Sequence, residues 1–146
     1  MSLVAFGGVA NASDSVSLTA RLTGAQEVPP ADPDGRGKAK LDIDVAGGGV
    51  CFDITFSDTG TPNRGHIHAG AAGVNGPIVI PFFELRPADA PATDPRHDEL
   101  EQGGFEDCVN ADPALLAAIV ANPENYYVNV HNTRFPGGAI RCQIER

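Results

Sequence analysis

Strict alternation of apolar and polar residues in two neighbouring segments is the feature that most constrains the fold of this chain. In residues 38–45 every second position is apolar and the positions between are charged: Ala39, Leu41, Ile43 and Val45 against Lys38, Lys40, Asp42 and Asp44. Side chains alternate between the two faces of a β-strand, so this segment predicts a strand with one face in the core and one in water. The glycines at 47–49 lead into a second alternating segment, residues 50–56. Together the two segments predict a β-hairpin.

Other segments of the chain extend this β pattern. Strand-like stretches lie at residues 15–22, 66–68, 77–83, 126–132 and 139–144, and the apolar run 77–83 predicts a strand covered on both sides. One helix is indicated at residues 114–121, with Asp112 as its N-cap and Pro113 at its first position. Residues 84–111 are acidic and contain prolines, which indicates an irregular segment. We therefore predict a mainly β chain: an antiparallel Greek-key β-sandwich of seven or eight strands with one short helix.

Composition narrows the possible partners. A chain of 146 residues with 42 % hydrophobic residues is expected to form one folded domain. Its net charge of −9, without any cluster of basic residues, argues against nucleic acid and anionic membrane surfaces as partners. No apolar run approaches the length of a membrane span.

The N-terminus indicates export. Residues 4–10 are small and apolar, and Ala10-Asn11-Ala12 resembles a signal-peptide cleavage site, so residues 1–12 are interpreted as the tail of a secretory signal. A merely flexible terminus explains the same residues equally well. On the first interpretation, residues 13–146 form a single domain that is secreted or extracytoplasmic.

Three cysteines fit an exported protein with one disulfide and one free thiol. Alternation places Cys51 on the outer face of its strand and Cys142 on the apolar face of another, so these two thiols face different environments. Cys108 lies in the segment that is expected to be irregular, where it can reach the outer face beside Cys51. We predict the disulfide Cys51–Cys108 and a buried Cys142 thiol.

Three of the four histidines lie in two strand-like segments. In a strand His66 and His68 share one face while Ile67 takes the other, and His131 points away from the face of Val128 and Val130. If the two strands are neighbours, we expect the three rings to converge at a solvent-exposed spot outside the core. Three imidazoles without thiolates would suit copper or zinc.

Hydrogen bonding is the alternative explanation for these histidines. His68 could fix the glycine-rich loop that follows it, and His131 could fix the turn at residues 134–138. Asn129 and Arg141 are predicted to flank the histidines, with Arg141 either steering an anion or forming a cross-strand ion pair or hydrogen bond. His97 is expected to be a solvated loop residue rather than a further ligand.

Five ordered segments together resemble the chordin domain (CHRD) family. They are LTGAQEVPP at 22–30, GHIHAG at 65–70, GVNGPIV at 73–79, YVNVHN at 127–132 and FPGGAIR at 135–141. The resemblance runs from about Leu18 to the C-terminus, and the chain departs from the family pattern at Cys142, where glycine is usual. It implies an exported β-rich module, without a general biochemical activity.

A second similarity is to the copper/zinc superoxide dismutase sandwich. That family binds copper through a His-x-His pair and a histidine in a Val-x-Val-His-like strand, which His66, His68 and His131 resemble in the same order; its zinc-loop histidines have no match here. The fold is thus expected to be superoxide-dismutase-like or immunoglobulin-like. We predict a non-catalytic binding or structural module that recognises an extracellular protein or a component of the cell envelope. The alternative is a copper protein with a redox or metal-carrier function.

Overall fold

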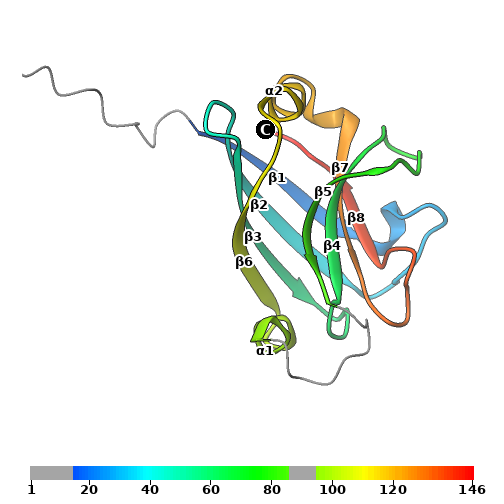
Figure 1. Ribbon diagram of the computed structural model, residues 1–146. Coiled ribbons are helices and arrows are strands. Elements are labelled where there is room, and N and C mark those ends of the chain that lie inside the picture. The colour runs from blue at the N-terminus through cyan, green and yellow to red at the C-terminus, as the bar shows by residue number, and fades with distance from the viewer. Residues whose placement is uncertain (1–14, 86–94) are drawn as a thin grey trace, which may run out of the picture.

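Eight strands in one antiparallel sheet make up most of the protein. The computed structural model describes residues 15–85 and 95–146, and the strands follow the order β5-β4-β7-β8-β1-β2-β3-β6 (Figure 1). Their bounds are β1 (Val16–Thr23), β2 (Arg36–Asp44), β3 (Gly49–Ser57), β4 (Arg64–Ala69), β5 (Ile78–Glu84), β6 (Gly104–Asn110), β7 (Tyr126–His131) and β8 (Ile140–Gln143). The helices are α1 (Pro95–Glu101) and α2 (Pro113–Ala121), with the short 3₁₀ segments η2 (Gly24–Gln26) and η3 (Pro123–Asn125).

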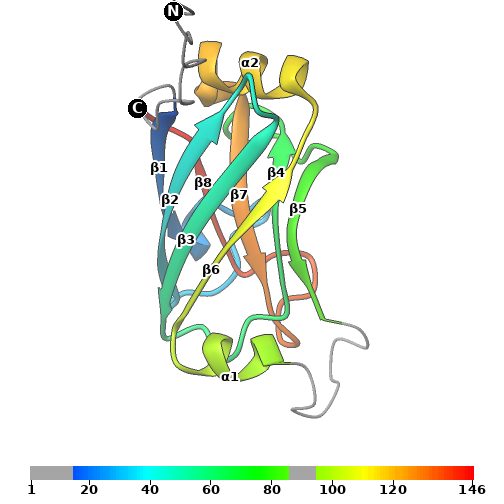
Figure 2. The same cartoon turned by 60° about the vertical axis from the view of Figure 1, so that its left-hand side comes forward.

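The sheet curls until its two edge strands approach each other. Phe52 of β3 stacks on Phe82 of β5 with ring centroids 4.3 Å apart, and Phe83 of β5 meets Phe105 of β6 at 5.3 Å. The two halves of the sheet therefore face each other across one core, as the layers of a sandwich do. Helices α2 and α1 lie at opposite ends of the curled sheet (Figure 2). The prediction of a mainly β, antiparallel fold is confirmed.

The hairpin expected from alternation is present as β2 and β3. Leu41 of β2 lies opposite Phe52 of β3, and Leu41, Ile43 and Ile54 are fully buried. The predicted helix is α2, and the Asp112 side chain accepts a hydrogen bond from the Ala114 amide, as its N-cap role requires.

Two sequence-based expectations about the second half of the chain are wrong. Residues 84–111 are not irregular throughout, because they contain α1 and β6, so the described chain has two α-helices rather than one. Strand β6 was not predicted because Phe105 is its only buried side chain and Val109 is only partly buried, so the segment has no clear alternating apolar pattern. Strand β5 is not covered on both sides: it forms an edge of the sheet, and Ile78 is 48 % exposed.

Some expectations concern residues outside the described ranges. The proposed signal-peptide tail, residues 1–12, lies there, as does the start of the predicted domain at residue 13. Among the helices that the structure describes, none is both long and apolar enough to cross a membrane.

The predicted disulfide is present between Cys51 and Cys108. The two residues lie directly opposite each other in β3 and β6, on the exposed outer face of the sheet. The bond therefore ties edge strand β6 to the rest of the sheet. Cys142 is the free cysteine and is buried, as predicted, and burial raises the pKa of its thiol.

Replacing both Cys51 and Cys108 by Ser is expected to lower the free energy of unfolding by about 2–4 kcal/mol, since the bond closes a loop of 57 residues. Urea unfolding followed by circular dichroism measures the change. Dithiothreitol should lower the midpoint of the wild type to the same extent and leave the double variant unaffected. Equal midpoints for oxidised and reduced wild type would contradict this role of the disulfide.

Candidate metal centre

Strands β4 and β7 bring the three predicted histidines together on the outer face of the sheet. These strands pair with His66 opposite Asn129 and Arg64 opposite His131. Ile67, Val128 and Val130 occupy the other face and join the hydrophobic core. One potential ligand atom from each of His66, His68 and His131 lies within 4.8 Å of the other two. The predicted convergence of the three rings is thus present.

One nitrogen of each ring contacts a hydrogen-bond acceptor. His66 Nε2 lies 2.8 Å from Glu84 Oε1, His68 Nδ1 lies 2.9 Å from the Gly76 carbonyl, and His131 Nδ1 lies 2.9 Å from the Pro136 carbonyl. A carbonyl or ionised carboxylate can only accept, so each of these ring nitrogens donates. The predicted structural bonds of His68 to the glycine-rich loop and of His131 to the following turn are therefore present.

These bonds fix the state of the other ring nitrogens. A neutral imidazole carries a single N–H, so His66 Nδ1, His68 Nε2 and His131 Nε2 are left as unprotonated acceptors. His66 Nδ1 and His131 Nε2 face each other at 3.3 Å. His68 Nε2 is buried and has no hydrogen-bond partner among residues 15–85 and 95–146. The hydrogen bonds to Glu84, Gly76 and Pro136 thus account for one nitrogen of each ring, and the second nitrogen of His131 also lies 3.1 Å from Asn129 Oδ1.

The histidines are buried, contrary to the expectation of a solvent-exposed site. Only 0 %, 8 % and 6 % of His66, His68 and His131 is exposed. Burial is the main reason that the pKa values of all three fall below the usual 6.5, to about 4 for His131. The rings are therefore neutral at physiological pH, which is the state in which imidazole binds a metal.

Loops that follow strands β4 and β7 contact the histidines, through the Gly76 carbonyl at His68 and the Pro136 carbonyl at His131. The loop of residues 70–77 is held by Arg141, whose guanidinium donates to the carbonyls of Ala71 and Val74 and to Asn75 Oδ1. Asn75 in turn donates to the carbonyl of Val28, in the loop that follows β1. Alternation cannot reveal these contacts, because they join segments that are far apart in the sequence.

Of the two roles considered for Arg141, the steering of an anion does not fit its position in the structure. Only 1 % of Arg141 is exposed, and its guanidinium lies 3.4 Å from the centroid of the Tyr127 ring. Tyr127 stacks on His68, with ring centroids 4.7 Å apart. Arg141 therefore anchors the loop of residues 70–77 through hydrogen bonds and makes a cation–π contact with Tyr127. It forms hydrogen bonds, as the second role required, but to a loop rather than across to a neighbouring strand.

Glu27 is a buried residue of this region to which sequence reasoning gave no role. It is 5 % exposed, and its Oε1 lacks a hydrogen-bond partner within the described part of the chain. Burial raises its pKa to about 7, although the Arg141 charge and a hydrogen bond from Asn129 act in the opposite direction. In the sequence, Glu27 stands out only as a member of the 22–30 segment that resembles the CHRD family. A local pattern of residues cannot show that this segment lies near the histidines.

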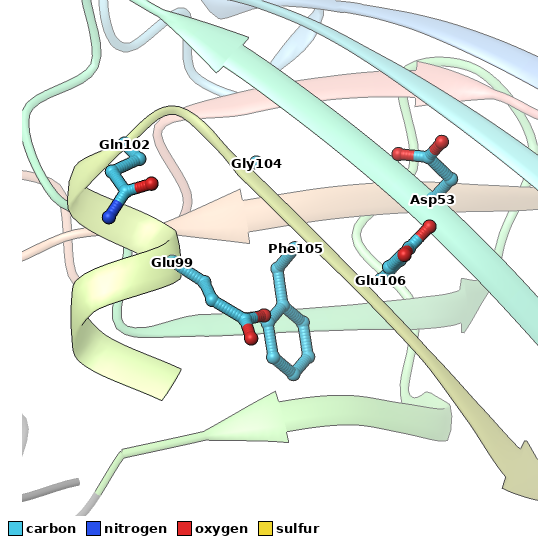
Figure 3. A pocket seen from close by; sticks show the side chains of 6 residues that line it. All are labelled: Asp53, Glu99, Gln102, Gly104, Phe105 and Glu106. Atoms are coloured by element: carbon cyan, nitrogen blue, oxygen red, sulfur yellow. The ribbon is translucent and has the colours of Figure 1, made fainter. Parts of the chain in front are cut away.

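His97 is not part of this site. It lies in α1, where it groups with Asp98 and Glu101 rather than with the other histidines. A shallow depression of about 290 Å³ near α1 is lined by Asp53, Glu99, Gln102, Gly104, Phe105 and Glu106 (Figure 3). Asp98 and Glu101 are exposed, whereas His66, His68 and His131 are all buried, so the three buried histidines remain the candidate centre.

Comparison with protein families gives one match, and comparisons with curated proteins and with solved structures give none. The CHRD domain model matches residues 18–144. These residues include all eight strands except the first two positions of β1, together with the whole histidine cluster. This chain belongs to the CHRD domain family.

Proposed function

We propose that this extracellular-type β module binds one copper ion through His66 Nδ1, His68 Nε2 and His131 Nε2. The supporting observation is that His66 Nδ1 and His131 Nε2 lie 3.3 Å apart, and that one potential ligand atom of His68 lies within 4.8 Å of those of the other two histidines. The hydrogen bonds described above leave His66 Nδ1, His68 Nε2 and His131 Nε2 without a proton. Two ligand atoms that each bind a metal ion at about 2.0–2.1 Å in tetrahedral geometry lie about 3.3–3.4 Å from each other. The 3.3 Å between His66 Nδ1 and His131 Nε2 already meets that requirement.

Three further contacts favour a metal at this position. Each candidate ligand donates its second N–H to a carbonyl or carboxylate, an arrangement that orients metal-binding histidines and makes them stronger ligands. Imidazole ligands without thiolates suit Cu(II) and Zn(II), and Cu(II) binds such sites more tightly. Bound copper would supply one-electron redox chemistry or would be a cargo. Since the histidines are buried, we infer that only molecules of a few atoms could reach it.

Titration of untagged protein with Cu(II), followed by calorimetry and by the visible d–d absorption, tests the proposal. We expect one equivalent of copper to bind and to remain bound after dialysis, with Zn(II) competing more weakly. An absence of retained copper would contradict the proposal. The predicted extracellular partner and the absence of catalysis stay predictions.

Copper affinity should depend only weakly on pH. Three ordinary imidazoles would lose about 1000-fold in affinity between about pH 7.5 and about pH 5.5, because protons compete with the metal. Here burial lowers the pKa of all three rings, to about 4 for His131, so His131 stays neutral over the whole range and His66 and His68 stay neutral to lower pH than ordinary imidazoles. We expect a loss of far less than 1000-fold, measured by competition with a chelator of known affinity at each pH. A full 1000-fold loss would indicate that the rings titrate normally.

A further inference from the structure

Asn129 lies between the histidines and Glu27. It is 3 % exposed and lies opposite His66 on β4 and Arg141 on β8. Its amide donates a hydrogen bond to the Glu27 carboxylate. A primary amide has one oxygen and one NH₂ group on opposite sides. Because the NH₂ group of Asn129 points to Glu27, its Oδ1 atom points away from Glu27. Asn129 Oδ1 accordingly lies 3.1 Å from His131 Nε2.

The backbone at Gly138 makes room for the Glu27 carboxyl group. A Cβ atom at this position would lie 2.6 Å from Glu27 Oε1 and 2.7 Å from Oε2. Gly138 also has φ +128°, which side-chain-bearing residues rarely adopt. The turn between β7 and β8 thus accommodates a buried carboxyl group beside Asn129.

The contact between Asn129 Oδ1 and His131 Nε2 is not an ordinary hydrogen bond. His131 Nδ1 carries the proton, which it donates to Pro136, so both Nε2 and the amide oxygen are acceptors. Two acceptors at this distance repel each other unless a cation lies between them. Their separation of 3.1 Å is close to that of two ligands bound to one metal ion.

We propose that Asn129 Oδ1 is a fourth ligand of the metal bound by His66, His68 and His131, and that Glu27 is the positioning residue that holds the oxygen toward it. This proposal rests on the proposed function. An amide oxygen is a neutral, weak ligand of the kind that occupies axial positions in copper proteins. Asn129 would thereby complete the coordination without adding charge to the buried centre.

Electron paramagnetic resonance of the Cu(II)-loaded protein tests the proposal, with affinity measured in parallel. Asn129→Leu removes the oxygen at nearly constant volume. It should shift g∥ and A∥, keep the superhyperfine pattern of the imidazole nitrogens and lower the affinity by about tenfold. Asn129→Asp restores an oxygen ligand and should recover the affinity. Glu27→Gln replaces the carboxylate by a neutral amide that can also donate, which weakens the preference for the Asn129 NH₂ group on this side, so its spectrum should move toward that of Asn129→Leu.

Glu106→Gln is the matched control, because Glu106 is an exposed acidic residue of β6. Its spectrum should equal that of the wild type. Near-ultraviolet circular dichroism checks that each variant is folded. If Asn129→Leu does not fold, Glu27→Gln and Asn129→Asp, which conserve the shape of the side chain, still test the proposal. If the wild type binds copper and the spectra of folded Asn129 and Glu27 variants match it, the Asn129 proposal is wrong and the three-histidine site stands. If the wild type binds no copper, both proposals fail.

Discussion

Replacing His131 by Ala is expected to lower the affinity of the protein for Cu(II) at least about 100-fold, since loss of a ligand should exceed the 10–100-fold effect of losing a group that merely supports one. His131 Nε2 lies 3.3 Å from His66 Nδ1, so its loss removes one of three potential ligands and leaves only the two imidazoles of β4. Calorimetric titration of the untagged variant measures the change.

The matched control for this substitution is His97→Ala. His97 lies in α1 and belongs to a separate group with Asp98 and Glu101, so its removal should leave the affinity for Cu(II) unchanged. If His131→Ala retained the wild-type affinity, or if His97→Ala lost it, copper would be bound elsewhere. A lower thermal midpoint of His131→Ala without any change in copper binding would point to a purely structural histidine.

Replacing Arg141 by Ala is expected to lower the free energy of unfolding by about 3–5 kcal/mol, the range for disrupting a buried charged group and its partners. The side chain is almost completely buried and donates to the carbonyls of Ala71 and Val74. Its loss leaves these acceptors unpaired and removes the anchor of the loop above the histidines. The urea midpoint measures stability, and hydrogen exchange of the Gly76 and Val74 amides measures opening of the loop.

Two further variants sharpen this prediction. Arg141→Lys should recover little, because an ammonium group lacks the planar fork that contacts several acceptors and stacks on Tyr127. Arg21→Ala removes an exposed arginine and should change stability by no more than about 0.5 kcal/mol. Similar stabilities of Arg141→Ala and wild type would contradict the anchoring role.

The sequence was most informative where one short segment determines the structure. Strict alternation predicted the hairpin of β2 and β3 because half of each strand faces water and half faces the core. The N-cap at Asp112 followed from local chemistry, and the face of Cys51 led to the correct disulfide. Strand β6 shows the limit of this approach, since an edge strand with a single buried side chain has no alternating pattern to detect.

The three histidines of the candidate site could be predicted from the sequence, whereas their surroundings could not. Alternation placed His66, His68 and His131 on the same face, and pairing of β4 with β7 brought them together. Their burial depends on loops fixed by contacts distant in the sequence, such as those of Arg141. The roles inferred for Glu27 and Gly138 depend on the same tertiary packing.

The copper content and nitrogen coordination of untagged, dialysed protein test the central claim most directly. After loading with Cu(II), we predict one copper per chain and an electron paramagnetic resonance spectrum with superhyperfine splitting from three imidazole nitrogens. Copper that washes out on dialysis, or a spectrum unchanged when His66, His68 and His131 are replaced together, would show that these buried rings only hold the fold together.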